Sequence, residues 1–136
     1  MSQETADQRL ALCVHRLTRE YVNRRTEEKS KVKWEDFKNS KDDKGRIMYP
    51  LKYREEREKV CSDAFLAMRG RRDKDFVEYF TGTVCSVPQF LPEEDYLVVS
   101  QELINRPDTV KTLSMLALSA CSYLGGASDQ QEGGKQ

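Results

Sequence analysis

Apolar residues recur at three- and four-residue steps along most of the chain, which is the spacing of one face of an α-helix. In the first segment, from about Glu4 into the mid-twenties, this stripe consists of Leu10, Cys13, Val14, Leu17 and Tyr21. No segment alternates apolar and polar residues for long enough to predict a strand. The pattern therefore predicts an all-α protein.

The segment that follows contains an aromatic pair, Trp34 and Phe37, spaced three residues apart. This spacing predicts one or two helical turns, and we expect both rings, together with Tyr53, to pack in the core. Residues 39–46 hold no large apolar side chain and include Gly45, so they are expected to form a mobile surface loop.

Proline and glycine mark the next two helices. Pro50 is expected to open a helix that ends at about Arg69, with Gly70 as its stop signal. Asp73 is expected to cap a further helix that reaches Pro88. Because that helix is apolar on more than one side, the sequence predicts that it is the most central element.

Two more helices are predicted towards the C-terminus. Pro92 opens the first and Pro107 the second, which ends at Gly125. The glycine-rich, polar residues 125–136 predict a disordered tail. The expected architecture is one domain over residues 1–124, a compact bundle of about five main helices plus a short one, followed by this flexible tail.

A net charge of zero, from 23 Lys or Arg and 23 Asp or Glu, conceals an uneven distribution. Residues 1–74 hold 20 basic and 14 acidic side chains, a net +6, whereas residues 75–136 hold 3 basic and 9 acidic side chains, a net −6. Such asymmetry indicates a nucleic acid as the partner of the basic half and a protein as the neighbour of the acidic half.

The sequence argues against several classes of protein. It contains no apolar run near the roughly 18 residues that a membrane span requires, and its polar N-terminus is unlike a signal peptide, so a cytoplasmic protein is expected. The four cysteines, at positions 13, 61, 85 and 121, are too far apart for a zinc knuckle or a redox motif. They are expected to be free thiols in the core.

The sequence also lacks the usual signatures of catalytic and cofactor sites. His15 is the one histidine, and no Cys or His at helical spacing completes a metal site with it. The glycines Gly45, Gly70 and Gly82 stand alone rather than in a phosphate-binding loop, and no serine lies in a nucleophile elbow. We therefore expect neither enzymatic activity nor a cofactor or metal.

Basic residues with aromatic residues between them are the main candidates for function. Lys and Arg neutralise phosphates, and aromatic faces stack unpaired bases. Arg69, Arg71 and Arg72 form the densest group, at the turn between two helices. The alternative, equally weighted here, is a solvated surface whose helix-end arginines bind terminal carbonyls. The candidate nucleic-acid contacts are Arg16, Arg19, Arg24, Arg25, Lys31, Lys33, Lys52, Arg54, Arg69, Arg71 and Arg72.

Two adjacent stretches of the sequence resemble a known family. They are EKVCSDAFLAMRGRR, at residues 58–72, and DFVEYFTGTVCSV, at residues 75–87. They are similar to the C-terminal helical region of the large subunit of type I, I-B-like, CRISPR interference complexes, and the resemblance covers nearly the whole chain. In several such systems this region is also made separately from an internal start codon as the small subunit of the Cascade complex. A chain of 136 residues that begins with Met1 fits that origin.

The resemblance implies a non-catalytic small subunit of an RNA-guided complex of antiviral defence. Such a subunit braces the assembly and contacts target DNA, chiefly the displaced non-target strand of the R-loop. The implied partners are the large subunit, the crRNA-bound backbone subunits, further copies of the chain and the R-loop between crRNA and target DNA. The alternative that the residues leave open is a helical protein-interaction adaptor with no nucleic-acid contact.

Overall fold

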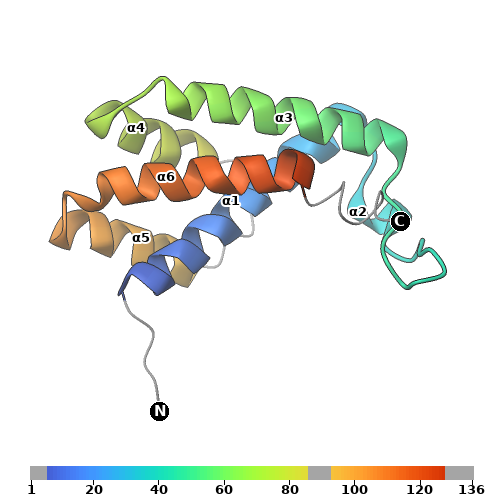
Figure 1. Ribbon diagram of the computed structural model, residues 1–136, viewed down its shortest axis with the longest axis horizontal. Coiled ribbons are helices and arrows are strands. Elements are labelled where there is room, and N and C mark those ends of the chain that lie inside the picture. The colour runs from blue at the N-terminus through green and yellow to red at the C-terminus, as the bar shows by residue number, and fades with distance from the viewer. Residues whose placement is uncertain (1–5, 86–92, 128–136) are drawn as a thin grey trace, which may run out of the picture.

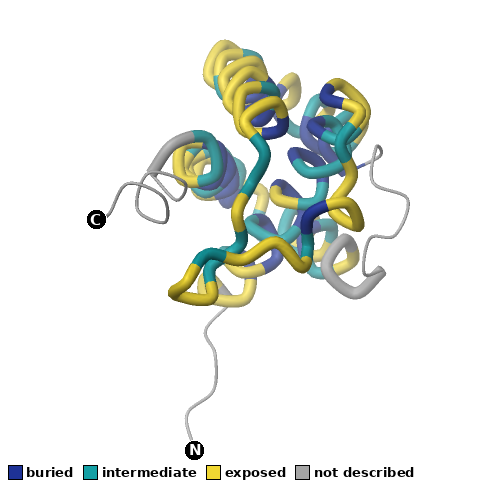
Figure 2. The backbone as a smooth tube through the Cα atoms, turned by 90° about the vertical axis from the view of Figure 1, so that its right-hand side faces the viewer, coloured by how far each residue is buried: buried dark blue, intermediate teal, exposed yellow. Residues whose placement is uncertain are grey.

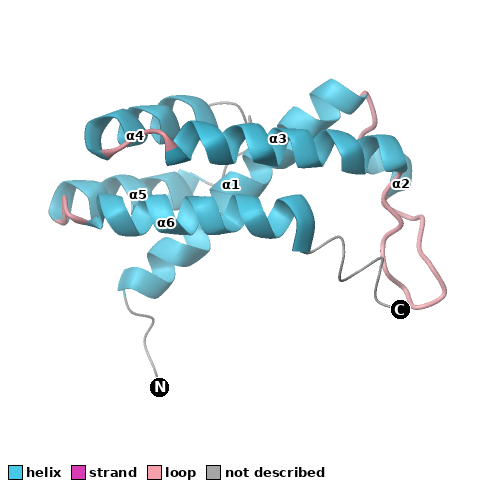
Figure 3. Ribbon diagram, turned by 45° about the horizontal axis from the view of Figure 1, so that its top comes forward, coloured by secondary structure: helices cyan, strands magenta, loops and turns pink. Residues whose placement is uncertain are grey.

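The helices of the chain are packed side by side in the computed structural model of Figure 1, which describes residues 6–85 and 93–127. In chain order they are α1 (Ala6–Ser30), α2 (Trp34–Phe37), α3 (Leu51–Arg69), α4 (Asp73–Tyr79), α5 (Glu93–Asn105) and α6 (Thr109–Ser122), with π-helical turns η1 (Phe80–Val84) and η2 (Tyr123–Ala127). Within these two ranges there is no strand, and Figure 3 shows helices joined by loops. The predicted all-α fold is confirmed.

α1 is the central helix of the bundle. It packs against α3, α5 and α6, and it crosses the bundle diagonally in Figure 1. Val14 and Leu17 on the predicted stripe are fully buried, and so is Val22 on a second side of the helix. The prediction that the fourth helix is the most central is wrong, because α1 buries two sides over 25 residues whereas α4 has seven residues. Figure 2 shows the buried positions facing one another inside the bundle.

α3 begins and ends where the sequence predicted. Pro50 is its N-cap, and Gly70 is its C-cap. The Gly70 N–H donates to the carbonyl of Leu66 at 3.2 Å, and its φ of −81° keeps it in the right-handed region. The buried face of α3 includes Cys61 and Met68, which join the core that α1 anchors.

The aromatic prediction is correct in part. Phe37 and Tyr53 are buried, but Trp34 is 42% exposed. The prediction that Trp34 packs in the core is wrong. Trp34 is the first residue of a single helical turn, and its indole contacts the Phe37 ring only edge to face, with ring centroids 5.4 Å apart. It therefore lies at the rim of the aromatic cluster.

The loop before α3 is held by side-chain hydrogen bonds. The Asp42 carboxylate accepts the N–H groups of Lys44 and Arg46 at 2.9 Å, and an antiparallel bridge pairs Lys41 with Ile47. The bond from the Arg46 N–H is the main cause that lowers the pKa of Asp42. Gly45 has φ +80°, a conformation that glycine adopts without a steric penalty.

The predicted cap of α4 is wrong. Arg72 is the N-cap, in an extended conformation, and no side chain makes a cap hydrogen bond. Asp73 instead has φ +51°, in the left-handed region that Asp tolerates better than most residues. The chain turns into α4 through this residue, so Asp73 is needed for the turn rather than for the cap.

Further along the chain, the rings of Phe76 in α4 and Phe80 in η1 stack with their centroids 5.8 Å apart.

Gly125 does not stop the last helix. α6 continues as η2 to Ala127, three residues beyond the predicted end of the bundle at position 124. Gly125 lies against α3, where an added Cβ would be 2.8 Å from the Cβ of Cys61. The absence of a side chain thus allows close helix packing. The rest of the expected tail (128–136), Pro88 and Pro92 lie outside the described residues.

The four cysteines are buried and free, as the sequence predicted. Desolvation by burial raises the pKa of Cys85 and of Cys121 to about 12, so these thiols are neutral near pH 7.

Across the described residues, no helix combines the length and apolar character that a membrane span requires.

Gly125→Ala should destabilise the fold by about 1–3 kcal/mol, because the new methyl group overlaps the Cβ of Cys61, which cannot move without its backbone. Gly82→Ala is the matched control. Nothing lies within 4 Å of a Cβ built there, so its effect should be neutral or stabilising by up to about 1 kcal/mol. Urea denaturation of both variants tests this, and equal midpoints would contradict the close approach.

Phe80→Ala should lower the free energy of unfolding by about 3–5 kcal/mol. The side chain is fully buried and stacks on Phe76, so truncation loses its transfer free energy and leaves a cavity. Calorimetry or denaturant unfolding measures the change. A loss below about 1 kcal/mol would show that the site collapses around the smaller side chain.

Candidate nucleic-acid interface

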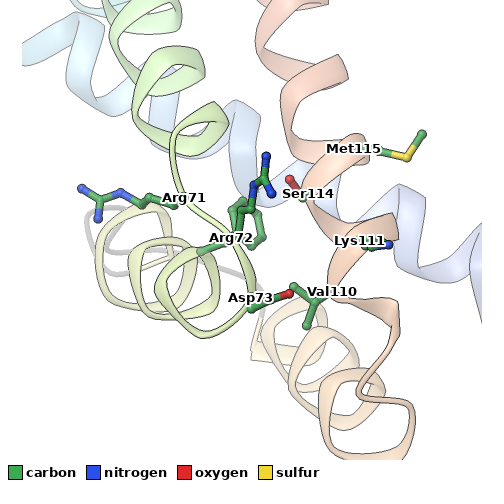
Figure 4. Close-up of a pocket in the computed structure, with 8 residues that line it drawn as sticks. Arg71, Arg72, Asp73, Val110, Lys111, Ser114 and Met115 are labelled. Atoms are coloured by element: carbon green, nitrogen blue, oxygen red, sulfur yellow. The ribbon is translucent and has the colours of Figure 1, made fainter.

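A cleft separates the turn between α3 and α4 from the start of α6 (Figure 4). Its volume is about 320 Å³. It contains three cationic side chains and one carboxylate, together with apolar side chains and a hydroxyl. The lining residues are Arg71, Arg72, Asp73, Phe76, Val110, Lys111, Ser114 and Met115. The formal charge of these side chains is +2, which favours an anion in the cleft.

The backbone at the end of α3 places the two arginines of the cleft. Gly70 ends the helix, and the Arg71 N–H still donates to the Met68 carbonyl at 3.1 Å. Arg72 is already extended, with φ −135° and ψ 153°, and its carbonyl accepts the N–H of Asp75 at 3.1 Å. The change from the helical turn to this extended residue separates the two side chains, and Arg71 and Arg72 diverge in Figure 4.

The two arginines have different surroundings. The guanidinium of Arg71 lies over the ring of Tyr79, 4.7 Å from its centroid, and Figure 4 shows this side chain directed away from α6. Tyr79 in turn shares a hydrogen bond with Tyr21 of α1, and its partial burial is the main cause that raises its pKa. In the same view, Arg72 extends towards α6 on the side of Ser114. Arg72 is therefore the arginine that can reach a ligand in the cleft.

Lys111 is the functional candidate that sequence reasoning missed. It is exposed in the first turn of α6, 39 residues after Arg72, and lies in the acidic half of the chain. A signal in the sequence that could have identified Lys111 is the rarity of basic residues around it, since residues 75–136 contain only three basic side chains. Neither Arg72 nor Lys111 forms an ion pair with any residue in the part of the chain that the structure describes.

The other predicted contacts lie outside the cleft, on α1, on the connection that follows it and on α3. Arg16, Arg19, Arg24 and Arg25 lie on α1, and Arg25 is occupied by an ion pair with Glu28 at 2.9 Å. The remaining cations of the prediction follow α1 or lie at the ends of α3, and they are Lys31, Lys33, Lys52, Arg54 and Arg69. Of the eleven predicted residues, the cleft gathers Arg71 and Arg72.

The described residues contain no group of three or more His, Cys, Asp or Glu side chains placed to hold a metal ion. His15 is half-buried on α1. The cleft offers charge and hydrogen bonding: a guanidinium, an ammonium and a serine hydroxyl are groups that can bind anionic oxygens.

Comparison with protein families gives a match over residues 1–121, to the type I-B CRISPR Cas8b C-terminal domain. The chain belongs to this family. As a Cas8b C-terminal domain it corresponds to the C-terminal region of the large subunit of a type I-B Cascade complex, and it is a component of that CRISPR system. The family resemblance drawn from residues 58–87 is confirmed to this extent. Comparison with curated proteins found no match, and neither did comparison with solved structures.

Proposed function

We propose that this Cas8b C-terminal domain acts as a non-catalytic small subunit of a Cascade complex and contacts target DNA through the cleft between Arg72 and Lys111. The observation that carries the proposal is that the cleft holds two cations, Arg72 and Lys111, which form no ion pair with any residue that the structure describes. The contact is to the phosphate backbone, because guanidinium and ammonium groups bind phosphate oxygens irrespective of sequence. The displaced non-target strand of the R-loop supplies such a backbone.

The bracing role rests on the uneven charge. The segment 31–54 holds eight Lys or Arg and four Asp or Glu, a net +4, whereas the half that begins at residue 75 carries a net −6. Complementary surfaces of this kind favour a head-to-tail contact between copies or with the backbone subunits. In this role the domain needs no cofactor, and it acts in the cytoplasm with the large subunit, the crRNA-bound backbone subunits and further copies of itself.

Co-purification tests the assembly role. The full chain, expressed with the other subunits of a type I-B complex and a crRNA, should be recovered in an RNA-containing particle. The double variant Arg72→Ala with Lys111→Ala should be recovered equally well, because both side chains are exposed and neither supports the core. Absence of the wild-type chain from the particle would contradict the proposal.

The same double variant should weaken binding of single-stranded DNA and flatten the plot of log affinity against log salt. Each lost phosphate contact contributes about 0.7 to that slope, so two contacts change it by about 1.4. Lys59→Ala is the matched control for Lys111→Ala. Lys59 is also exposed on a helix, and its ammonium lies 3.8 Å from Glu56, so its removal should leave the slope unchanged.

Asp73→Asn should have the opposite effect, since it removes the carboxylate of the cleft and Asn also tolerates the left-handed backbone. Affinity for single-stranded DNA should rise for this variant. An unchanged salt slope in the double variant, together with normal recovery in the particle, would favour the alternative function, a protein-interaction adaptor that makes no contact with nucleic acid.

A further inference from the structure

Trp34 presents a partly uncovered indole at the opposite end of α3 from the cleft. It is 42% exposed, whereas Phe37 below it is 3% exposed. The two rings meet at 83°, and among the described residues no ring lies in a parallel stack with the indole. An aromatic ring that nothing stacks is available to a planar partner from outside the chain.

The turn that carries Trp34 is fixed at both ends. The Trp34 N–H donates to the Glu27 carboxylate at 3.1 Å, and its carbonyl accepts the Lys38 N–H at 2.8 Å. The Lys33 N–H donates to the Asp36 carboxylate at 3.0 Å, which completes the turn. The backbone that carries the indole is thus fixed before any ligand arrives, so binding there loses little backbone entropy.

A rigid aromatic layer supports this turn. The Phe37 ring lies 5.3 Å from Tyr49 and 5.0 Å from Tyr53, and the two tyrosines stack at 5.9 Å. The guanidinium of Arg57, a residue that is 6% exposed, lies 4.6 Å from the Tyr49 centroid. This cation–π contact anchors the layer to α3.

Two ammonium groups next to Trp34 are available to an anionic ligand. The nearby carboxylates are already engaged, because Glu27 and Asp36 accept backbone N–H groups and Glu35 pairs with Lys38 at 2.8 Å. Lys31 and Lys33, on the connection directly before Trp34, are exposed and form no ion pair with any described residue. A stacking face next to such ammonium groups is the combination that binds single-stranded nucleic acids.

From these observations we infer that Trp34 stacks on an unpaired base of a single strand while Lys31 and Lys33 neutralise the adjoining phosphates. The inference rests on the proposed function and adds a second contact to it, with a base rather than with the backbone. α3 has 19 residues and is about 28 Å long, so one strand that reaches both ends is held at two separate points.

The chain contains one tryptophan, so its fluorescence reports on this site alone. The full chain is titrated with oligothymidine of about 12 nucleotides, within the range of known single-strand sites, and with an abasic strand of equal length. Oligothymidine should quench the emission of Trp34, and the abasic strand should not. The two strands carry equal charge, so the difference isolates stacking.

Trp34→Ala should lower the affinity for oligothymidine about 5- to 150-fold, as expected for the loss of one stacked base, and leave the affinity for the abasic strand unchanged. Leu66→Ala is the matched control, since it truncates an exposed apolar side chain on α3, away from Trp34, and should change neither affinity. Circular dichroism melting of each variant establishes that the helices are intact, and Trp34→Phe should restore part of the lost affinity.

Unquenched emission on binding, or equal affinity for the two strands, would overturn the inference. If Arg72→Ala with Lys111→Ala still flattens the salt slope in that case, the proposed function stands and only the base contact fails. If Trp34→Ala leaves DNA binding intact but prevents recovery of the chain in the Cascade particle, the exposed side chains of Trp34, Met48 and Leu51 dock a protein, which also overturns it.

Discussion

The burial of α1 against three other helices is the constraint on which the rest of the molecule depends. A fully buried Val or Leu contributes roughly 1.5–3 kcal/mol, and α1 supplies such residues on two sides, with Leu17 towards one and Val22 towards another. Because α3, α5 and α6 must each reach this helix, their apolar faces are turned inwards. The polar faces and the chain reversals between helices are therefore left for interactions with other molecules.

Close packing at the C-terminal end of α6 also depends on the packing of the helices around α1. α6 and α3 share α1 as a neighbour, and η2 brings Gly125 against Cys61. A glycine is required there because the two backbones approach more closely than a side chain permits. The position of α6 in turn places its first turn, which carries Lys111, at the cleft that Arg72 also lines.

The two ends of α3 combine charge with aromatic residues in different ways. At the C-terminal end, the reversal at Gly70 separates Arg71, which covers Tyr79, from Arg72, which is open to the cleft. At the N-terminal end, Arg57 is used inside the aromatic layer and Trp34 is left at the rim. In both places one arginine, Arg71 or Arg57, contacts an aromatic ring of the protein. Other cations remain for a ligand: Arg72 at the cleft, and Lys31 and Lys33 beside the exposed ring of Trp34. This division supports the proposed contact of the domain with nucleic acid.

The sequence by itself determined the helical class, the start of α3 after Pro50 and its end at Gly70, and the buried thiols, because these follow from local periodicity and from the backbone preferences of proline and glycine. Only the tertiary structure decided which helix is central, since burial on two sides depends on which neighbours a helix acquires. It also decided that Lys111 joins Arg72 across 39 residues and that Trp34 stays exposed while Phe37 is buried. These outcomes depend on contacts between segments distant in the chain, which no local pattern encodes.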